Sequence, residues 1–242
     1  MNEHTSDGHA SAPSARDAES DGSGAPTNVV IVLYERFTAL DAIGPYEVLS
    51  RMPGARVTFS AAEPGPLRTD NGVLTVLVEH ALAAVGQPDV VLVPGGPGDV
   101  AARAGDTVLE WLREADRGSA WTTSVCTGSL VLAAAGLLHG RRATSHWLAL
   151  EELRALGAQP VSERVVFDGK LVTAAGVSAG IDMALALAAR MAGESVAQAI
   201  QLGIEYDPQP PFDSGSPQKA PAEIVRALRE LSPRIQGVAA AR

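Results

Sequence analysis

The chain has 242 residues, of which 46% are hydrophobic and 19% charged, a composition typical of a globular protein. Its formal net charge of −9 argues against a nucleic-acid partner, because phosphate backbones repel an acidic surface. No stretch approaches the ~18 uninterrupted apolar residues of a membrane span, the amino end lacks the apolar core of a signal peptide, and one cysteine cannot form an internal disulfide. We therefore expect a cytoplasmic protein.

Both ends of the chain differ in composition from its middle. Residues 1–26 are rich in Ser, Gly, Ala, Asp and Pro and have nothing to bury, so we predict a disordered tail. Residues 27–242 are predicted to form a single domain with a C-terminal extension. In that extension the Pro/Ser/Gly-rich segment 208–220 is expected to lie along the surface, and 221–235 to form a last helix.

The first half of the domain alternates between strand and helix patterns. The β-branched run NVVIVLYE indicates a strand that is covered on both faces. The predicted elements are a strand at 28–35, a helix at 41–52, a strand at 55–63, a strand or ribbon outside the main sheet at 72–80, a buried strand with a glycine-rich turn at 88–98, and a helix at 106–118.

The second half continues the alternation. The predicted elements are a strand at 120–125, helices at 127–138 and 147–157, a hairpin at 163–176 that turns at Asp168-Gly169, and helices at 178–193 and 195–207. Strands that alternate with helices form βαβ units. The pattern therefore predicts an α/β fold with a doubly wound, mostly parallel sheet.

Cys126 is the only cysteine, and it lies between the strand at 120–125 and the helix that follows. This position is at the carboxyl edge of a parallel sheet, where α/β proteins bind ligands, and it faces a helix amino end that favours an anion. We therefore expect a lowered thiol pKa and a nucleophile on a tight turn, which Gly128 permits. The alternative is ordinary packing, since free cysteine is often a small buried hydrophobe.

Several motifs in order resemble one family. SVCTGSLVLAAAGLLHGRRATSHW (124–147), LDAIGPYEVL (40–49), VLVPGG (91–96) and AGIDMALALA (179–188) resemble the DJ-1/PfpI superfamily, and the likeness extends over 28–206. QLGIEYDPQPPFDSGSPQKAP (201–221) also resembles the tail of its isonitrile hydratases, although AraC-type regulators with such an amino domain carry almost the same cysteine segment. The resemblance implies a flavodoxin-like α/β sandwich, usually a homodimer.

The resemblance also assigns three catalytic residues. Cys126 matches the nucleophile, Asp41 the acidic residue beside it, and Thr127 the neighbour that contributes to the site. Burial and a nearby thiolate should raise the pKa of Asp41, so that it could act as a general acid near neutral pH. The alternative for Asp41 is a helix N-cap, because it stands near a helix start.

Four further residues are candidates for substrate binding. The backbone N–H groups of Gly95 and Gly96 could stabilise charge as an oxyanion hole does, or the glycines could simply form a tight turn. His146 could contact substrate or hold its own loop. Ile43, with Tyr46 and Trp147, could line a pocket. VPGGPG lacks the spacing of a nucleotide loop, and no residues have metal-ligand spacing.

The resemblance predicts an enzyme that hydrates a small isonitrile to an N-substituted formamide without a cofactor. Cys126 would attack the isonitrile carbon, Asp41 would protonate it to give a thioimidate, and the same carboxylate would activate water. Two alternatives stay open. The first is a sensor module like that of AraC-type regulators, although those proteins continue into DNA-binding helices and this chain has only 35 residues after Asp207. The second is another activity of the superfamily, whether glyoxalase-like, chaperone-like or biosynthetic. A peptidase is disfavoured, because Thr127 stands where those relatives carry histidine.

Overall fold

The computed structural model describes residues 26–235, and its centre is a seven-stranded sheet of order β10-β11-β7-β6-β1-β2-β5. The predicted tail lies outside the described residues, except for Pro26. All neighbouring strands are parallel apart from β10 and β11. The strands are β1 (Thr27–Val32), β2 (Ala55–Ala61), β5 (His80–Ala81), β6 (Val90–Val93), β7 (Trp121–Val125), β10 (Val165–Asp168) and β11 (Leu171–Ala174).

The order of the central strands, β2-β1-β6-β7-β11, is the order 2-1-3-4-5 of flavodoxin-like sheets. The mostly parallel, doubly wound α/β fold predicted from the sequence is thus confirmed. Strands β1 and β6 are buried on both faces, with side chains at 0–2% exposure from Val29 to Val32 and from Val90 to Val93. This is why both segments are continuous aliphatic runs rather than alternating ones.

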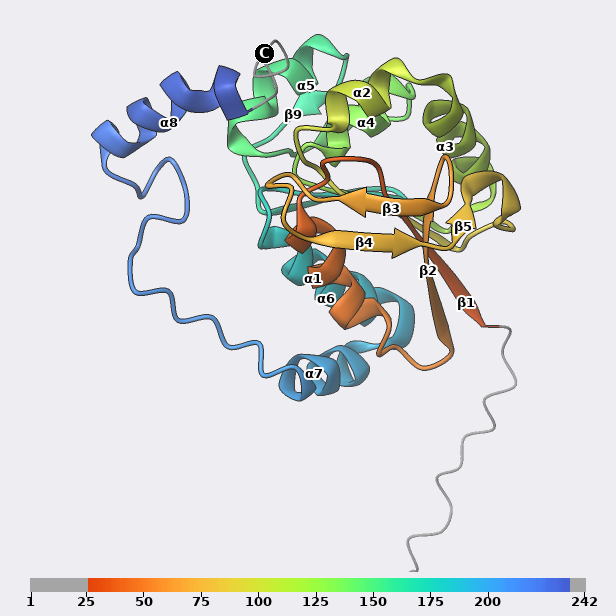
Figure 1. Ribbon diagram of the computed structural model, residues 1–242. Coiled ribbons are helices and arrows are strands. Elements are labelled where there is room, and N and C mark those ends of the chain that lie inside the picture. The colour runs from red at the N-terminus through yellow and green to blue at the C-terminus, as the bar shows by residue number, and fades with distance from the viewer. Residues whose placement is uncertain (1–25, 236–242) are drawn as a thin grey trace, which may run out of the picture.

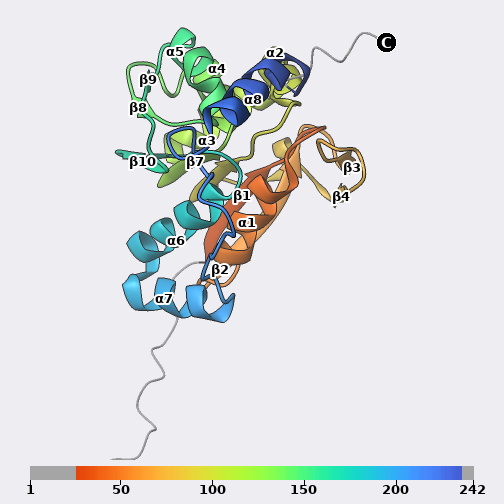
Figure 2. The same ribbon diagram turned by 90° about the vertical axis from the view of Figure 1, so that its left-hand side faces the viewer.

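Helices cover both faces of the sheet (Figures 1 and 2). One layer holds α1 (Ala39–Leu49), α6 (Ala179–Ala192) and α7 (Glu194–Gly203). The opposite layer holds α2 (Asp99–Ala104), α3 (Asp106–Gly118), α4 (Gly128–Ala134) and α5 (Leu150–Ala155), the last preceded by the 3-10 turn η2 (Trp147–Ala149). A second 3-10 turn, η1 (Leu82–Ala84), follows β5. No helix among residues 26–235 has the length and apolarity that a membrane crossing needs.

Some short elements were not predicted. The ribbon expected at 72–80 is β4 (Thr75–Val78), and it pairs antiparallel with an unpredicted β3 (Gly65–Arg68) outside the main sheet. Helix α2 and the two-residue strands β8 (Arg142–Ala143) and β9 (Gln159–Pro160) were also missed, because elements this short leave no periodic pattern. The hairpin at 163–176 turns as predicted at Gly169, whose φ is +63°.

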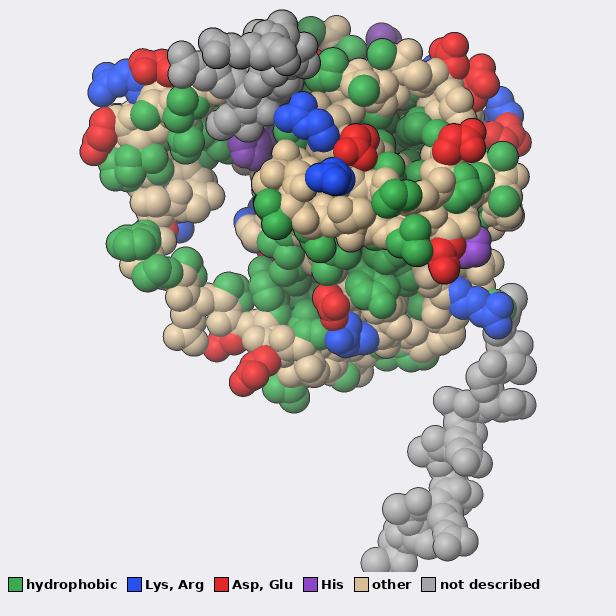
Figure 3. Space-filling view, in the orientation of Figure 1, with side chains coloured by type: hydrophobic (Ala, Val, Ile, Leu, Met, Phe, Trp, Pro, Cys, Tyr) green, Lys and Arg blue, Asp and Glu red, His purple; other side chains and the backbone are tan. Residues whose placement is uncertain are grey.

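The C-terminal extension leaves α7 and ends in α8 (Ala222–Ile235). Residues 207–215 are all exposed, and Figure 3 shows an opening between this segment and the body of the protein. The first part of the segment 208–220 therefore stands off the surface along which it was expected to lie, whereas residues 215–218 line a cavity together with residues of the body of the protein. On α8, three apolar side chains point at least partly to solvent, namely Ile224, Leu228 and Leu231.

Glycine permits a close approach of chains where β6 and β7 end. A Cβ atom added to Gly128, the first residue of α4, would lie 2.1 Å from the carbonyl oxygen of Val93. No real Cβ contact is that short, and the partner atom is backbone that cannot move aside cheaply. The turn after Cys126 can therefore lie against the end of β6 only because residue 128 is glycine.

We predict that Gly128→Ala lowers the free energy of unfolding by at least about 2 kcal/mol, because the new methyl group overpacks the junction. The matched control is Gly203→Ala in α7, where an added Cβ meets nothing within 4 Å. It should leave stability unchanged or raise it by up to about 1 kcal/mol, as alanine favours helix. Urea unfolding of both variants measures the difference, and equal effects would contradict the close approach.

Candidate active site

Cys126 occupies the bend between β7 and α4. Its φ is +56°, in the left-handed region that non-glycine residues rarely adopt. Its N–H donates to the carbonyl oxygens of Ala174 at 3.1 Å and Ala175 at 2.9 Å, and its own carbonyl accepts the hydroxyls of Ser129 at 3.1 Å and Ser145 at 3.0 Å. Hydrogen bonds on both sides thus hold a strained bend of the kind that presents a nucleophile.

Asp41 lies in the first turn of α1 and is fully buried. It is not the N-cap, since that position is Thr38. Its Oδ2 instead accepts the N–H of Gly95 at 2.9 Å, across the sheet edge. Its Oδ1 is buried without a hydrogen bond of ordinary geometry, and the Cys126 thiol interacts with this carboxyl. The structure therefore brings Asp41 and Cys126 together.

Burial raises the pKa of Asp41 from 3.8 to about 7, against the lowering effects of the Gly95 N–H and the Cys126 thiol, and Asp70 raises it further. The shift has the direction expected from the sequence, with burial as its main cause. A carboxyl group with this pKa exchanges protons readily near neutral pH.

The expectation of a lowered thiol pKa is wrong. Burial and the neighbouring Asp41 raise the pKa of Cys126 well above 9, and the N–H groups of Val177 and Thr127 only partly oppose them. The side chain is 6% exposed, and α4 has only seven residues, so its amino end offers too little to offset the loss of water. Above about pH 7 the pair therefore holds one proton, which thiol and carboxyl can exchange.

A cavity of about 490 Å³ opens over the sulfur. Its size suits a small organic ligand. Apolar, charged and neutral polar residues surround the nucleophile in this cavity. The lining consists of Thr38, Asp70, Gly96, Pro97, Asp99, Val100, Arg103, Cys126, Thr127, His146, Leu148, Glu152 and Val177. Asp41 is not part of this lining, but its carboxyl interacts with the Cys126 thiol, which is part of it.

The predicted oxyanion hole is not present at Gly95 and Gly96. The N–H of Gly95 donates to Asp41, and the N–H of Gly96 donates to the Thr127 hydroxyl at 2.9 Å. Both donors thus orient side chains of the site and are not free for substrate. Gly95 is required sterically, because a Cβ there would lie 2.5 Å from the Thr127 nitrogen and 2.8 Å from the Cys126 Cβ. Gly96 still lines the cavity.

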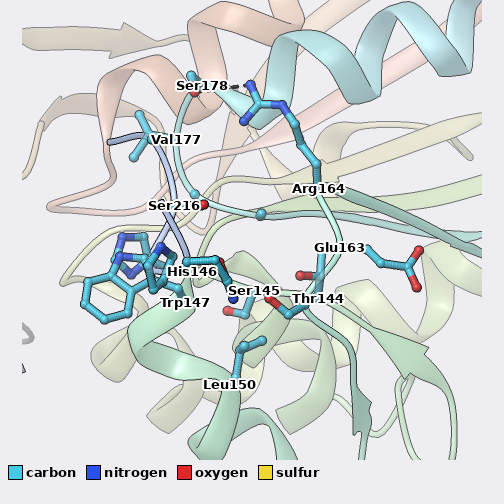
Figure 4. Close-up of a pocket in the computed structure, with 16 residues that line it drawn as sticks. Thr144, Ser145, His146, Trp147, Leu150, Glu163, Arg164, Val177, Ser178 and Ser216 are labelled. Atoms are coloured by element: carbon cyan, nitrogen blue, oxygen red, sulfur yellow. Dashed lines mark hydrogen bonds between the residues drawn. The ribbon is translucent and has the colours of Figure 1, made fainter. Parts of the chain in front are cut away.

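His146 serves its loop and lines ligand space as well. Its Nδ1 accepts the N–H of Leu148 at 3.4 Å, and burial lowers its pKa, so that it is neutral at pH 7. It lines the Cys126 cavity and also a second cavity of about 510 Å³, shown in Figure 4. Trp147 lies beside it in that second cavity, with the ring centroids 5.9 Å apart.

Ile43 does not line the Cys126 cavity. Two residues along a helix are separated by about 200° around its axis, so Ile43 points away from the side to which Asp41 points. It lines a different hollow, which it shares with Leu40, Ile181 and Ile204. Of its two companions in the prediction, Tyr46 packs against Phe59 with ring centroids 5.3 Å apart, and Trp147 lines the second cavity.

A charged group in the cavity wall was not predicted from the sequence. Asp99 and Arg103 are one turn apart on α2 with 3.8 Å between oxygen and nitrogen, and Arg103 pairs with Glu152 of α5 at 2.8 Å. Burial raises the pKa of Asp99 to about 6, with Arg103 and the Thr127 hydroxyl opposing the rise. The i,i+4 spacing after PGGPG was a weak signal for this pair. Only the fold places it in the same cavity as Cys126.

We predict that alkylation of Cys126 by iodoacetamide is slow at neutral pH and still accelerates at pH 9, the ordinary thiol value, because the thiol pKa is raised. Asp41→Asn removes a neighbouring negative charge, so its alkylation profile should move to lower pH. Mass spectrometry of the single cysteine gives the rates directly. A rate that levels off below pH 7 in the parent protein would contradict the raised pKa.

The buried carboxyl should also make stability depend on pH. A carboxyl whose pKa is about 7 when folded and 3.8 when unfolded stabilises the fold below pH 4, and the contribution falls as pH rises to 7. The loss amounts to about 4 kcal/mol, at about 1.4 kcal/mol per pKa unit.

Asp41→Asn has no titrating carboxyl at this position, so it should not lose this stability. Its free energy of unfolding relative to that of the parent should therefore rise between pH 4 and pH 7 and stay constant above pH 7. Urea titrations at pH 4.5, 6 and 8 measure the difference. Asp99→Asn is the control, and its free energy of unfolding relative to that of the parent should stop rising at about pH 6. A constant difference between the Asp41 variant and the parent over this range would refute the shift.

Comparison with known proteins places the chain in a family. The model of the DJ-1/PfpI family matches residues 27–190. Isonitrile hydratase of Pseudomonas putida is 43% identical over 202 residues, which cover 82% of this chain and 87% of that enzyme. The HTH-type transcriptional regulator CdhR of Pseudomonas aeruginosa is 34% identical over 162 residues, which cover 65% of this chain and 48% of the regulator.

A solved structure is similar over nearly the whole chain. The crystal structure of a ThiJ/PfpI family protein from Pseudomonas syringae has a TM-score of 0.86 and 33% identity, and the match covers 94% of this chain and 95% of the other. Drosophila melanogaster DJ-1beta matches with a TM-score of 0.69 and 25% identity, over 76% of this chain and all of that one. With the family model matched over most of the described residues and the same fold in these relatives, the chain belongs to the DJ-1/PfpI family.

Proposed function

We propose that this protein is a cofactor-independent isonitrile hydratase, which converts an isonitrile and water to an N-substituted formamide through a thioimidate on Cys126. The observation that carries the proposal is the pairing of Cys126 with the buried Asp41 beneath a largely apolar cavity. The 43% identity to isonitrile hydratase of Pseudomonas putida over most of both chains supports it.

The first half-reaction uses the single proton that the pair holds. Asp41 takes the proton of the Cys126 thiol, and the sulfur forms a bond to the terminal isonitrile carbon. An electron pair of the carbon–nitrogen triple bond moves to nitrogen, and the carbon takes the proton back from Asp41. The product is a thioimidate, and Asp41 is left as a carboxylate. A pKa near 7 lets one carboxyl both accept and return this proton.

The cavity is suited to an uncharged substrate of this kind. Val100, Leu148 and Val177 offer apolar surface for the substituent on nitrogen. The terminal carbon of an isonitrile is not an oxyanion and needs no pair of N–H donors at that point. The engagement of the Gly95 and Gly96 N–H groups inside the protein is therefore compatible with this reaction.

We predict that the protein converts cyclohexyl isonitrile to N-cyclohexylformamide without added cofactor. Cys126→Ser should lose at least about 10³-fold in kcat/KM because the nucleophile is gone, and Asp41→Asn about 10²- to 10⁴-fold because the proton carrier is gone. Formamide is quantified by chromatography with mass detection.

The matched control is Glu47→Gln, which removes an exposed carboxylate from the same helix, and it should keep parental activity. Absence of formamide from the parent protein over a range of alkyl and aryl isonitriles would rule out the function. Turnover that survives Cys126→Ser would leave the function and rule out the mechanism.

A further inference from the structure

We propose that Asp99 is the general base of the second half-reaction and activates the water that hydrolyses the thioimidate on Cys126. This inference depends on the proposed function and assigns to a second carboxyl the activation of water, which the family resemblance implied for Asp41. In this arrangement Asp41 handles the proton of the thiol, and Asp99 handles the proton of the water.

The two carboxyls have different access to ligand space. Asp41 is fully buried, hydrogen-bonded to Gly95, and absent from the lining of the Cys126 cavity. Asp99 lines that cavity together with Cys126 and Thr127. Water that attacks the thioimidate must arrive from the cavity, because the other side of the sulfur is packed protein. The carboxyl that such water meets is therefore one in the cavity wall.

Three carboxyls line the cavity, and their surroundings single out Asp99. Glu152 forms a 2.8 Å ion pair with Arg103, and its side chain is 41% exposed. Asp70 accepts the Thr38 hydroxyl at 2.9 Å and the N–H of Asn71 at 2.8 Å. Asp99 has a side chain that is 7% exposed, and its only ion-pair partner is 3.8 Å away among the described residues. It is thus the least solvated of the three, and it interacts with Arg103, the Thr127 hydroxyl and the N–H of Val100.

Asp99 also interacts with the residue next to the nucleophile. The Thr127 hydroxyl accepts the N–H of Gly96 at 2.9 Å and donates to the Gly96 carbonyl at 3.4 Å, and it lowers the pKa of Asp99. Thr127 follows Cys126 directly in the chain. The residue next to the nucleophile therefore favours the ionised form of Asp99, and all three residues line one cavity.

The electrostatic environment leaves Asp99 ionised but basic. Burial raises its pKa to about 6, while Arg103 and the Thr127 hydroxyl prevent a larger rise. At neutral pH this carboxyl is therefore mostly deprotonated, whereas Asp41, with a pKa of about 7, retains its proton more often. Two carboxyls whose surroundings separate their pKa values are suited to separate proton-transfer roles.

The step balances with water as the only other reactant. Asp99 takes one proton of the water as the water oxygen bonds to the thioimidate carbon, and the electron pair of the C=N bond moves to nitrogen, which receives that proton from Asp99. The C–S bond then breaks, and the sulfur leaves with the electron pair. The new hydroxyl loses the second proton to the Cys126–Asp41 pair as the carbonyl forms. The products are the formamide and the starting form of the protein.

The test is Asp99→Asn, mixed with cyclohexyl isonitrile and analysed by acid quench and intact-protein mass spectrometry. We expect the variant to form the adduct, with a mass increased by that of the substrate, and to lose about 10²-fold in turnover. Added formate should speed the decay of the adduct. Asp41→Asn, in contrast, should form no adduct. In the parent protein, adduct decay in a single turnover should slow as pH falls below about 6.

The matched control is Asp70→Asn, which removes a charge from the same cavity and should accumulate no adduct at any turnover rate. If the parent is active and the Asp99→Asn variant keeps its turnover, or loses turnover without forming an adduct, the assignment of Asp99 is wrong. An adduct that accumulates only in the Asp70 variant also contradicts the assignment. If the Asp99 variant does not fold, a parental decay rate that is independent of pH between 5 and 7 overturns it. If the parent protein forms neither formamide nor adduct, the proposed function itself is wrong.

Discussion

The site depends on the removal of Cys126 and Asp41 from water as a pair. Either group alone at this depth would be a buried acid held neutral, with no partner to take or give its proton. Together they hold one proton above neutral pH, and its transfer between sulfur and oxygen changes the nucleophile without changing the total charge. Such a pair needs no ionised thiol at rest, so the raised pKa of Cys126 is compatible with catalysis by its sulfur.

The fold supplies this pair from two distant segments at the carboxyl edge of one sheet. Cys126 follows β7, Asp41 enters from the first turn of α1, and the glycines after β6 lie between them. Because β6 is the neighbour of both β1 and β7, its terminal loop is the natural bridge. The glycine N–H groups therefore act as internal supports, one for Asp41 and one for Thr127. The lack of a side chain at Gly95 lets the elbow approach closely, and at Gly96 it makes room for the backbone of residues 36–38.

The two raised carboxyl pKa values have the same physical cause and different surroundings. Both arise mainly from burial, yet Asp41 is outside the lining of the cavity and beside the Cys126 thiol, and Asp99 lies in the cavity wall. Arg103 pairs with Asp99 and Glu152 in the lining of this cavity, and Val100, Leu148 and Val177 provide its apolar surface.

The sequence by itself predicted the doubly wound sheet and the turn at Cys126, and the family resemblance implied the pairing of Cys126 with Asp41. Short continuous runs of β-branched and aliphatic residues such as β1 and β6 indicate strands that are covered on both faces. The ordered motifs around Cys126 carried the resemblance. The sequence could not determine which way Ile43 faces, what the N–H groups of Gly95 and Gly96 bind, or whether the thiol pKa falls or rises. Those properties arise from contacts between residues that are distant in the chain: Asp41 and Gly95 are 54 positions apart, and Gly96 and Thr127 are 31 positions apart. Burial is a property of the packed chain. Only the tertiary structure decided that the loss of water raises the thiol pKa of Cys126 more than the amino end of the short helix α4 lowers it, and that Asp99 lines the same cavity.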